Sequence, residues 1–299
     1  MRYRLLTIAL TLAAVVSVVA ASRDQAPRSA AQLAAIEVTP PVGKDSVKFL
    51  VLGDTGTGDR GQYDTAAQVW KAHAVFPYEF AIMVGDNIYG SERPQDFNRK
   101  FETPYKPLLD ANIQFYAALG NHDDPNQRFY KPFGMGGQRF YTYQKKDARF
   151  FALDSNYMDK DQQTWLEKEL SASNSKWKIA YFHHPLYSSG ATHGSEVDLR
   201  TIIEPMFRKY NVNVVFAGHE HFYERVKPQS GIYYFTAGGS AKLRAGDLRS
   251  GNLTAKGFDT EQSFMVVELD GDVMRFQAIS RSGKRFDSGE ITRQNVGTQ

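Results

Sequence analysis

Residues 80–89, Phe-Ala-Ile-Met-Val-Gly-Asp-Asn-Ile-Tyr, are the stretch around which this chain is organised. The first five residues form an apolar run, which predicts a buried strand. A glycine ends the run, Asp86 follows at once, and Tyr89 lies three residues further on. A carboxylate at a strand end can bridge two metal ions, and a phenolate oxygen suits a hard ion such as ferric iron. Because Gly-Asp turns are common, this stretch alone is weak evidence for a metal site. The other strand ends of the chain strengthen it.

Four further predicted strands end in polar residues of the same kind. These strands are predicted at residues 47–52, 113–119, 177–182 and 212–217. The polar residues after them are Asp54, Asn121 with His122, His183 with His184, and His219 with His221. All of them offer oxygen or nitrogen atoms, which favours iron, zinc or manganese over a soft metal. Five such strand ends in one chain predict a metal centre rather than unrelated turns.

Helical and hairpin patterns fill the chain between these strands. Helices are predicted from residue 64, within 94–110 and over 163–170. A further helix is predicted after Ser195, its expected N-cap, and it should kink or restart at Pro205. Hairpins are predicted at 139–154 and 264–279. Strands alternate with helices in the middle of the chain and hairpins gather late, which predicts one α/β domain with a layered sheet core.

The composition of the 299-residue chain indicates an ordinary globular protein and excludes several other classes of protein. Hydrophobic residues make up 42% and charged residues 23%, as in ordinary globular proteins. The formal net charge is +3 and there is no block of basic residues, so nothing indicates binding to nucleic acid. The chain has no cysteine, which excludes disulfides and a lipid anchor on cysteine. The core and any bound metal must therefore hold the fold.

The first 21 residues have the pattern of a secretory signal peptide. A short basic region precedes an apolar run that reaches Ala20, and small residues surround the expected cleavage site. Because the run is shorter than the roughly 20 residues of a spanning helix, we expect cleavage rather than a stable membrane anchor. Residues 22–44 are then expected to form a flexible leader to a catalytic domain at 45–299. The protein is expected to be exported, either periplasmic or secreted.

Between residues 47 and 225 the chain resembles the calcineurin-like metallophosphoesterases, and among them the purple acid phosphatases of the tartrate-resistant type. The matching motifs are Gly53-Asp54, Gly85-Asp86-Asn87-Ile88-Tyr89, Gly120-Asn121-His122-Asp123, His183-His184-Pro185 and Gly218-His219-Glu220-His221. Tyr89 indicates the purple branch, because other metallophosphoesterases do not use a tyrosine ligand there. The resemblance implies an α/β (α+β) fold, a four-layer sandwich of two mixed β-sheets flanked by helices, with ligands on loops at the strand ends.

The resemblance also implies a centre of two metal ions. The first, expected to be Fe(III), would be held by Asp54, Asp86, Tyr89 and His221. The second, a divalent Fe, Zn or Mn ion, would be held by Asp86, Asn121, His183 and His219. Asp86 would bridge the two ions. His183 is the expected ligand because the family's ligand stands two residues before the proline, although the reverse assignment to His184 stays open.

A small-molecule phosphate ester is the substrate that the resemblance implies. Two ions about 3.5–4 Å apart can clamp a phosphate and lower the pKa of a bound water, so that a hydroxide attacks phosphorus. His122 is expected to protonate the leaving alkoxide, with Asp123 orienting it, and His193 is a second candidate. Phosphate monoesters are the expected substrates. A phosphodiesterase, or a metal-bearing binding protein without catalysis, stays open, and the sequence gives no oligomeric state.

Overall fold

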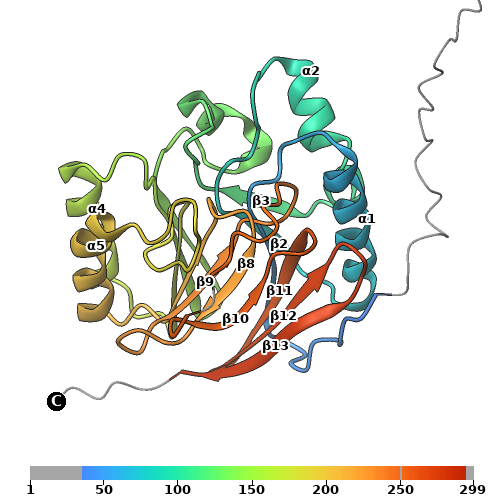
Figure 1. Ribbon diagram of the computed structural model, residues 1–299. Coiled ribbons are helices and arrows are strands. Elements are labelled where there is room, and N and C mark those ends of the chain that lie inside the picture. The colour runs from blue at the N-terminus through green and yellow to red at the C-terminus, as the bar shows by residue number, and fades with distance from the viewer. Residues whose placement is uncertain (1–35, 250, 294–299) are drawn as a thin grey trace, which may run out of the picture. The chain divides into compact units, whose positions relative to one another are not determined.

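The computed structural model describes residues 36–249 and 251–293. In this part of the chain two β-sheets pack face to face, and helices cover their outer faces (Figure 1). The predicted signal peptide and the predicted leader up to residue 35 lie outside the described residues. No helix within the described ranges is long and apolar enough to cross a membrane.

The first sheet has six strands in the order β13-β12-β11-β1-β2-β3. Their bounds are β1 (Val47–Leu52), β2 (Phe80–Met83), β3 (Gln114–Ala117), β11 (Ser263–Asp270), β12 (Val273–Ser280) and β13 (Arg285–Thr292). Strands β1, β2 and β3 are parallel, and Leu52, Met83 and Ala117 lie in register at their ends. The segments that follow these three strands therefore leave the sheet at the same edge.

The second sheet has seven strands in the order β10-β8-β9-β7-β6-β5-β4. Their bounds are β4 (Tyr141–Lys145), β5 (Ala148–Ala152), β6 (Trp177–Tyr181), β7 (Val214–Ala217), β8 (Tyr223–Val226), β9 (Tyr233–Ala237) and β10 (Thr254–Phe258). Strands β5, β6, β7 and β9 are parallel, with Tyr181 of β6 opposite Phe216 of β7. The histidine segments after β6 and β7 therefore also leave at one edge.

Aromatic side chains join the facing sides of the two sheets. Phe49 of β1 lies edge-on to Phe150 of β5, with ring centroids 5.3 Å apart, and to Phe216 of β7 at 6.0 Å. Phe80 of β2 lies edge-on to Phe150 at 5.3 Å. All four rings are fully buried, and burial of one such side chain stabilises a fold by about 1.5–3 kcal/mol. This core holds both sheets, and hence both sets of strand ends, in one rigid frame.

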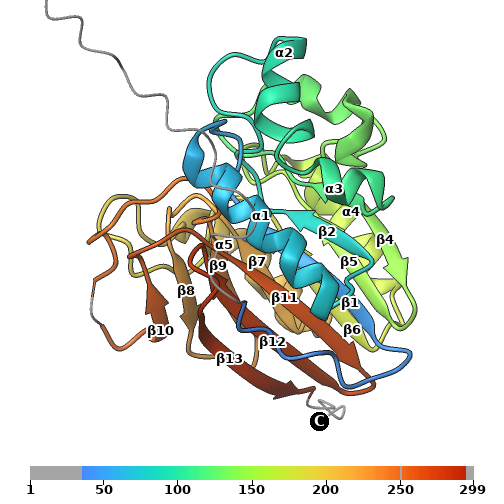
Figure 2. The ribbon, with the colours of Figure 1, turned by 90° about the vertical axis from the view of Figure 1, so that its right-hand side faces the viewer.

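Helices complete the predicted four layers. Helix α1 (Arg60–Val75) covers the outer face of the first sheet, and α4 (Lys160–Ser171) and α5 (Val197–Lys209) cover that of the second (Figures 1 and 2). Val69 of α1 and Ile203 of α5 are among the residues buried there. Shorter helical segments are α2 (Pro94–Phe97), α3 (Lys106–Asp110), a π-helix at Asn98–Glu102 and 3-10 turns at Pro125–Phe129 and Lys131–Phe133. The predicted fold class is confirmed.

Three predicted helix starts were wrong. Helix α4 begins at Lys160 rather than at residue 163, because the Asp159 side chain accepts a hydrogen bond from the Gln162 N–H. Helix α1 begins at Arg60 rather than at residue 64, because the Asp59 side chain accepts a hydrogen bond from the Gln62 N–H and caps the helix. Ser195 does not cap α5; its hydroxyl exchanges hydrogen bonds with the backbone of Ser188 instead.

Of the kink or restart predicted at Pro205, the restart does not occur. The helix runs as one element from Val197 to Lys209 with Pro205 inside it. A proline in a helix interior removes one backbone hydrogen bond. Tertiary packing of Ile203 and Phe207 into the core compensates for that loss.

Part of the expected leader belongs to the folded domain. The Thr39 N–H donates to Gln277 Oε1 at 2.8 Å. The N–H groups of Val42 and Gly43 donate to the buried carboxylate of Glu268 at 3.0 and 2.7 Å. These bonds attach residues 36–44 to β11 and β12, so the folded region starts before residue 45.

Candidate metal centre and active site

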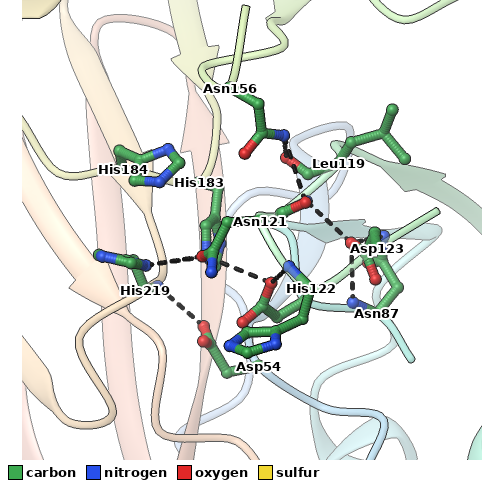
Figure 3. Close-up of polar contacts among 12 residues, drawn as sticks. Asp54, Asn87, Leu119, Asn121, His122, Asp123, Asn156, His183, His184 and His219 are labelled. Carbon is green, nitrogen blue, oxygen red and sulfur yellow. Dashed lines mark hydrogen bonds and ion pairs between the residues drawn. The ribbon is translucent and has the colours of Figure 1, made fainter. Parts of the chain in front are cut away.

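The predicted ligand residues lie together where strand ends of the two sheets meet. Asp54, Asp86 and Asn121 follow β1, β2 and β3 of the first sheet, and the histidine motifs follow β6 and β7 of the second. Figure 3 shows Asp54, Asn121, His183 and His219 directed toward a common region. The fold therefore collects donors from five loops that are far apart in the sequence.

Asp54, Asp86, Tyr89 and His221 form one group. Asp54, Asp86 and His221 each offer a ligand atom, and these atoms lie within 4.8 Å of one another. The Tyr89 hydroxyl is 2.9 Å from Asp54 Oδ1 and 3.2 Å from His221 Nε2. This is the set expected for the first metal, and its oxygen-rich character suits a hard cation.

Asn121, His183 and His219 form a second group beside the first. Asn121 Oδ1 is 2.9 Å from His183 Nε2 and 3.0 Å from His219 Nδ1, and the two nitrogens are 3.2 Å apart. His183 Nε2 is also 3.3 Å from Asp86 Oδ1. Asp86 therefore contacts both groups, as a bridging carboxylate must.

The geometry favours His183 over His184 as the member of this group. His183 Nδ1 is 3.0 Å from the Val84 carbonyl, to which it donates as N–H, and this leaves the Nε2 lone pair free to face the centre. His184 Nδ1 instead lies 2.8 Å from Ser155 Oγ. The structure thus brings His183 to the centre, and places His184 at its margin with its ring 4.5 Å from that of His219.

The charges of the centre are unbalanced without a cation. Burial and the neighbouring Asp86 raise the pKa of Asp54 well above its usual range, and burial raises the pKa of Tyr89. Burial lowers the pKa of His221 to about 4, so this ring is neutral and able to ligate. Asp86 Oδ2 is buried and has no hydrogen-bond partner in the described part of the chain. Cations fit this donor set, because they would satisfy the free oxygen and favour the ionised carboxylates.

Strained backbone and close packing accompany the ligand loops. Non-glycine residues with positive φ include Asp54 (56°), Asp86 (51°) and His219 (69°). Such conformations cost about 1–3 kcal/mol each and cluster at functional sites. Gly85 has a φ of 95°, and a Cβ there would lie 2.5 Å from His183 Nδ1. A Cβ on Gly120 would lie 2.1 Å from Asp86 Oδ1. The glycines of the motifs thus let the ligand loops pack against one another.

The two expected proton donors, His122 and His193, lie beside different donor groups. The His122 ring is 5.1 Å from the Tyr89 ring between centroids, and the His122 backbone N–H donates to Asp86 Oδ1 at 3.0 Å. The His193 ring is 4.1 Å from the His219 ring. A substrate placed between the groups would have one exposed imidazole on each side.

Asp123 does not have the contact expected of it. Its carboxylate accepts five hydrogen bonds of 2.8–3.1 Å, from the backbone of Asn87, Ile88 and Gly120 and from the side chains of Asn87 and Gln127. Among the described hydrogen bonds of Asp123, none goes to the His122 ring. The expectation that Asp123 orients His122 therefore lacks a hydrogen bond to support it. Asp123 instead ties the loop after β3 to the loop that carries Asp86.

We expect Asp123→Asn to lower the free energy of unfolding by about 1–3 kcal/mol, because an amide leaves buried N–H donors unpaired. Urea unfolding of the metal-free protein measures this change. Asp147→Asn, on the exposed turn between β4 and β5, is the control and should change stability little. Equal stability of the Asp123 variant and the wild type would show that this network does not brace the loops.

Sequence reasoning missed two contributors to the site. The Lys242 ammonium lies 4.7 Å from the centre of the Tyr89 ring, a cation–π contact. Asn87 lies in one of the motifs with no expected role, yet its amide donates to the Ala118 carbonyl at 2.8 Å and links the ends of β2 and β3. The spacing of the sequence does not point to Lys242, because Lys242 comes from a loop that is distant in the sequence. Asn87 could have been found, because it is a polar residue inside a metal-ligand motif.

Comparison with known proteins identifies the family. Residues 47–223 match the sequence model of the calcineurin-like phosphoesterases. The chain belongs to the calcineurin-like phosphoesterase family. Purple acid phosphatase 4 of Arabidopsis thaliana is 26% identical over 74% of this chain and 76% of its own. The Fe(3+)-Zn(2+) purple acid phosphatase 12 of the same plant is 31% identical over 59% of this chain and 44% of its own.

A solved structure supports the fold of this calcineurin-like phosphoesterase. Purple acid phosphatase PPD1 from yellow lupin (Lupinus luteus) seeds superposes with a TM-score of 0.69 at 20% identity, over 86% of this chain and 55% of that one. The resemblance to purple acid phosphatases that the motifs predicted is confirmed. The protein is a metal-dependent phosphoric ester hydrolase.

Proposed function

We propose that this phosphoesterase is an exported phosphatase that hydrolyses phosphate monoesters at a binuclear metal centre. The contact of Asp86 with both donor groups is the observation that carries the proposal. A single carboxylate shared by two donor groups can bridge two adjacent cations, as in a two-metal phosphatase site.

The donor set indicates which residues would hold the ions. Asp54, Asp86, Tyr89 and His221 would hold the first, and Asp86, Asn121, His183 and His219 the second. The first group includes a phenol, which suits Fe(III), and the second has neutral nitrogen and amide oxygen, which suits a divalent Fe, Zn or Mn ion. That one relative is named for Fe(3+) and Zn(2+) supports this pairing. Two bound cations would offset the charge of a phosphoryl group and make water acidic enough to act as a nucleophile near neutral pH.

The side chains around the centre then supply the proton transfer. His122 would donate a proton to the leaving alkoxide, because its exposed ring lies beside Tyr89 of the first group and histidine is the commonest general acid. His193 would contact the substrate from the side of His219. Asp123 would act through the backbone of the Asp86 loop.

Tyr89→Phe should abolish the visible charge-transfer band of the iron-loaded protein and weaken iron binding, because the phenolate oxygen is lost. The absorption spectrum and the iron content of the variant measure both effects. Tyr105→Phe, which removes another buried hydroxyl away from the ligand groups, should leave the spectrum unchanged. A Tyr89 variant that keeps the wild-type band would refute the tyrosinate assignment.

A paired assay from pH 4 to pH 9 tests the substrate class. The metal-replete protein is given an aryl phosphate monoester and the matching diester, and iron and zinc are quantified in the same sample. We expect faster monoester hydrolysis with an acidic optimum and iron present. Preferred diester hydrolysis would make the protein a phosphodiesterase at the same site. No hydrolysis of either ester with both metals bound would favour a binding role.

Export rests on the first 21 residues of the sequence. N-terminal sequencing of protein recovered from the periplasm or medium of an expressing bacterium should start near Ser22. Protein that stays inside the cell with Met1 present would contradict export.

A further inference from the structure

Glu220 stands between the two histidines of the 219–221 motif, yet its side chain turns away from the metal groups. It is fully buried. Its Oε1 accepts a hydrogen bond of 2.6 Å from the Gly194 N–H and one of 3.4 Å from the Ser188 hydroxyl. The carboxylate is therefore directed into the 188–194 loop, which carries His193. None of the groups that would hold the ions takes part in this contact.

The 188–194 loop packs against Glu220 very closely. A Cβ on Gly190 would lie 2.2 Å from Glu220 Oε1, so only glycine fits at this point of the loop. On its other side the loop is hydrogen-bonded to the segment after β9. The Ala191 N–H donates to the Asp247 carbonyl at 2.9 Å, and the Thr192 hydroxyl donates to Asp247 Oδ1 at 2.5 Å. The loop is thus held between Glu220 and Asp247.

Charged groups link this support to His193 and to the ligand segment. Glu220 Oε2 is 3.5 Å from His193 Nδ1 and 3.9 Å from Arg244 Nη1. Arg244 Nη1 is also 3.6 Å from Asp247 Oδ2, and the Arg244 backbone N–H donates to the His221 carbonyl at 3.0 Å. One cation therefore lies between two carboxylates beside the metal-ligand histidines.

We propose that Glu220 is a positioning residue, whose carboxylate fixes the 188–194 loop so that the His193 ring stays against His219 at the metal centre. This inference rests on the proposed function, in which His193 contacts the phosphate ester. Glu220 itself does not contact the substrate. Glu220 belongs to the rigid ligand segment after β7. By holding the 188–194 loop, it therefore fixes the position of the exposed His193 side chain relative to that segment.

A kinetic cycle tests whether Glu220 acts through His193. We compare Glu220→Ala, His193→Ala and the double variant with the wild type on an aryl phosphate. Each single change should lower kcat/KM by about 10- to 100-fold, the usual effect of losing a partner that orients an active-site group. The double variant should be no slower than His193→Ala, because the two residues act as one unit. Losses that multiply would contradict the proposal.

The conservative variant separates positioning from general stability. Glu220→Gln keeps an oxygen that can accept from the Gly194 N–H, so its kcat/KM should stay within about threefold of the wild type. Both Glu220 variants should keep two metals per chain. Loss of metal on Glu220→Ala would assign the residue to support of the ligand segment and would overturn the proposal.

Hydrogen exchange gives a result that does not depend on turnover. Peptides that cover residues 188–194 should exchange faster in Glu220→Ala than in the wild type, because the loop loses its anchor. Glu268→Ala removes a buried carboxylate that binds backbone N–H groups before β1, and it should leave exchange of this loop unchanged. Unchanged exchange in Glu220→Ala would refute the anchor. A wild type that binds both metals without hydrolysing esters would instead refute the proposed function, and the exchange result would still decide the role of Glu220.

Discussion

Asp86→Asn should reduce phosphatase turnover by about 10³-fold or more, the scale seen when a group that organises a whole catalytic site is lost. The substitution keeps the size of the side chain but removes its charge and one of its two anionic oxygens. Because Asp86 contacts both donor groups, a single change should affect both metal positions. Metal analysis should find fewer than two ions per chain under conditions that load the wild type fully.

The controls for this variant separate metal loss from unfolding. Glu268→Gln alters another buried carboxylate, which binds backbone N–H groups at the opposite end of β1, and it should keep both metals. Circular dichroism should show that the Asp86 variant keeps its sheets, since the aromatic core between them is unchanged. An Asp86 variant that binds two metals and turns over normally would rule out the bridging role.

His122→Ala should lower turnover by about 10²–10⁴-fold while leaving the metal content near that of the wild type. The ring lies against Tyr89 and is not a member of either donor group. The loss should be larger for an alkyl phosphate than for a nitrophenyl phosphate, because nitrophenolate leaves without needing a proton. This dependence on the leaving group is the signature of a general acid.

His73→Ala is the matched control for that experiment. His73 stacks on Trp70 in α1, which lies outside the site, so its removal should not change turnover. If His122→Ala instead empties the metal centre, His122 is a structural residue. An equal loss on alkyl and nitrophenyl phosphates would also exclude proton donation to the leaving group.

The parts of the fold that could be predicted are those with local signals. The strand β1 was predicted with its observed bounds, because an apolar run ends there in Gly-Asp. The strands β8, β10 and β13 were missed. Their sequences contain charged residues or glycine, and they become strands by pairing with neighbouring strands, β8 with β10 and β13 with β12, rather than through an apolar pattern of their own. Glu224 of β8, for example, is fully buried and gives no apolar pattern.

The candidate metal ligands were predictable because each of them follows a strand end, and parallel strands place such ends together. Contacts between loops were not predictable in this way. The bonds from Asp123 to the Asp86 loop and from Glu220 to Gly194 join segments that no periodicity relates. Adjacent residues of one motif therefore contact different loops.

Metal removal and restoration tests the central claim most directly. The purified protein is stripped with a chelator, and iron and zinc are added back in steps while bound metal and monoester hydrolysis are measured together. The account predicts no hydrolysis by the stripped protein and full hydrolysis only as bound metal approaches two ions per chain. Full hydrolysis by the stripped protein, or full loading with two ions and no hydrolysis, would contradict it.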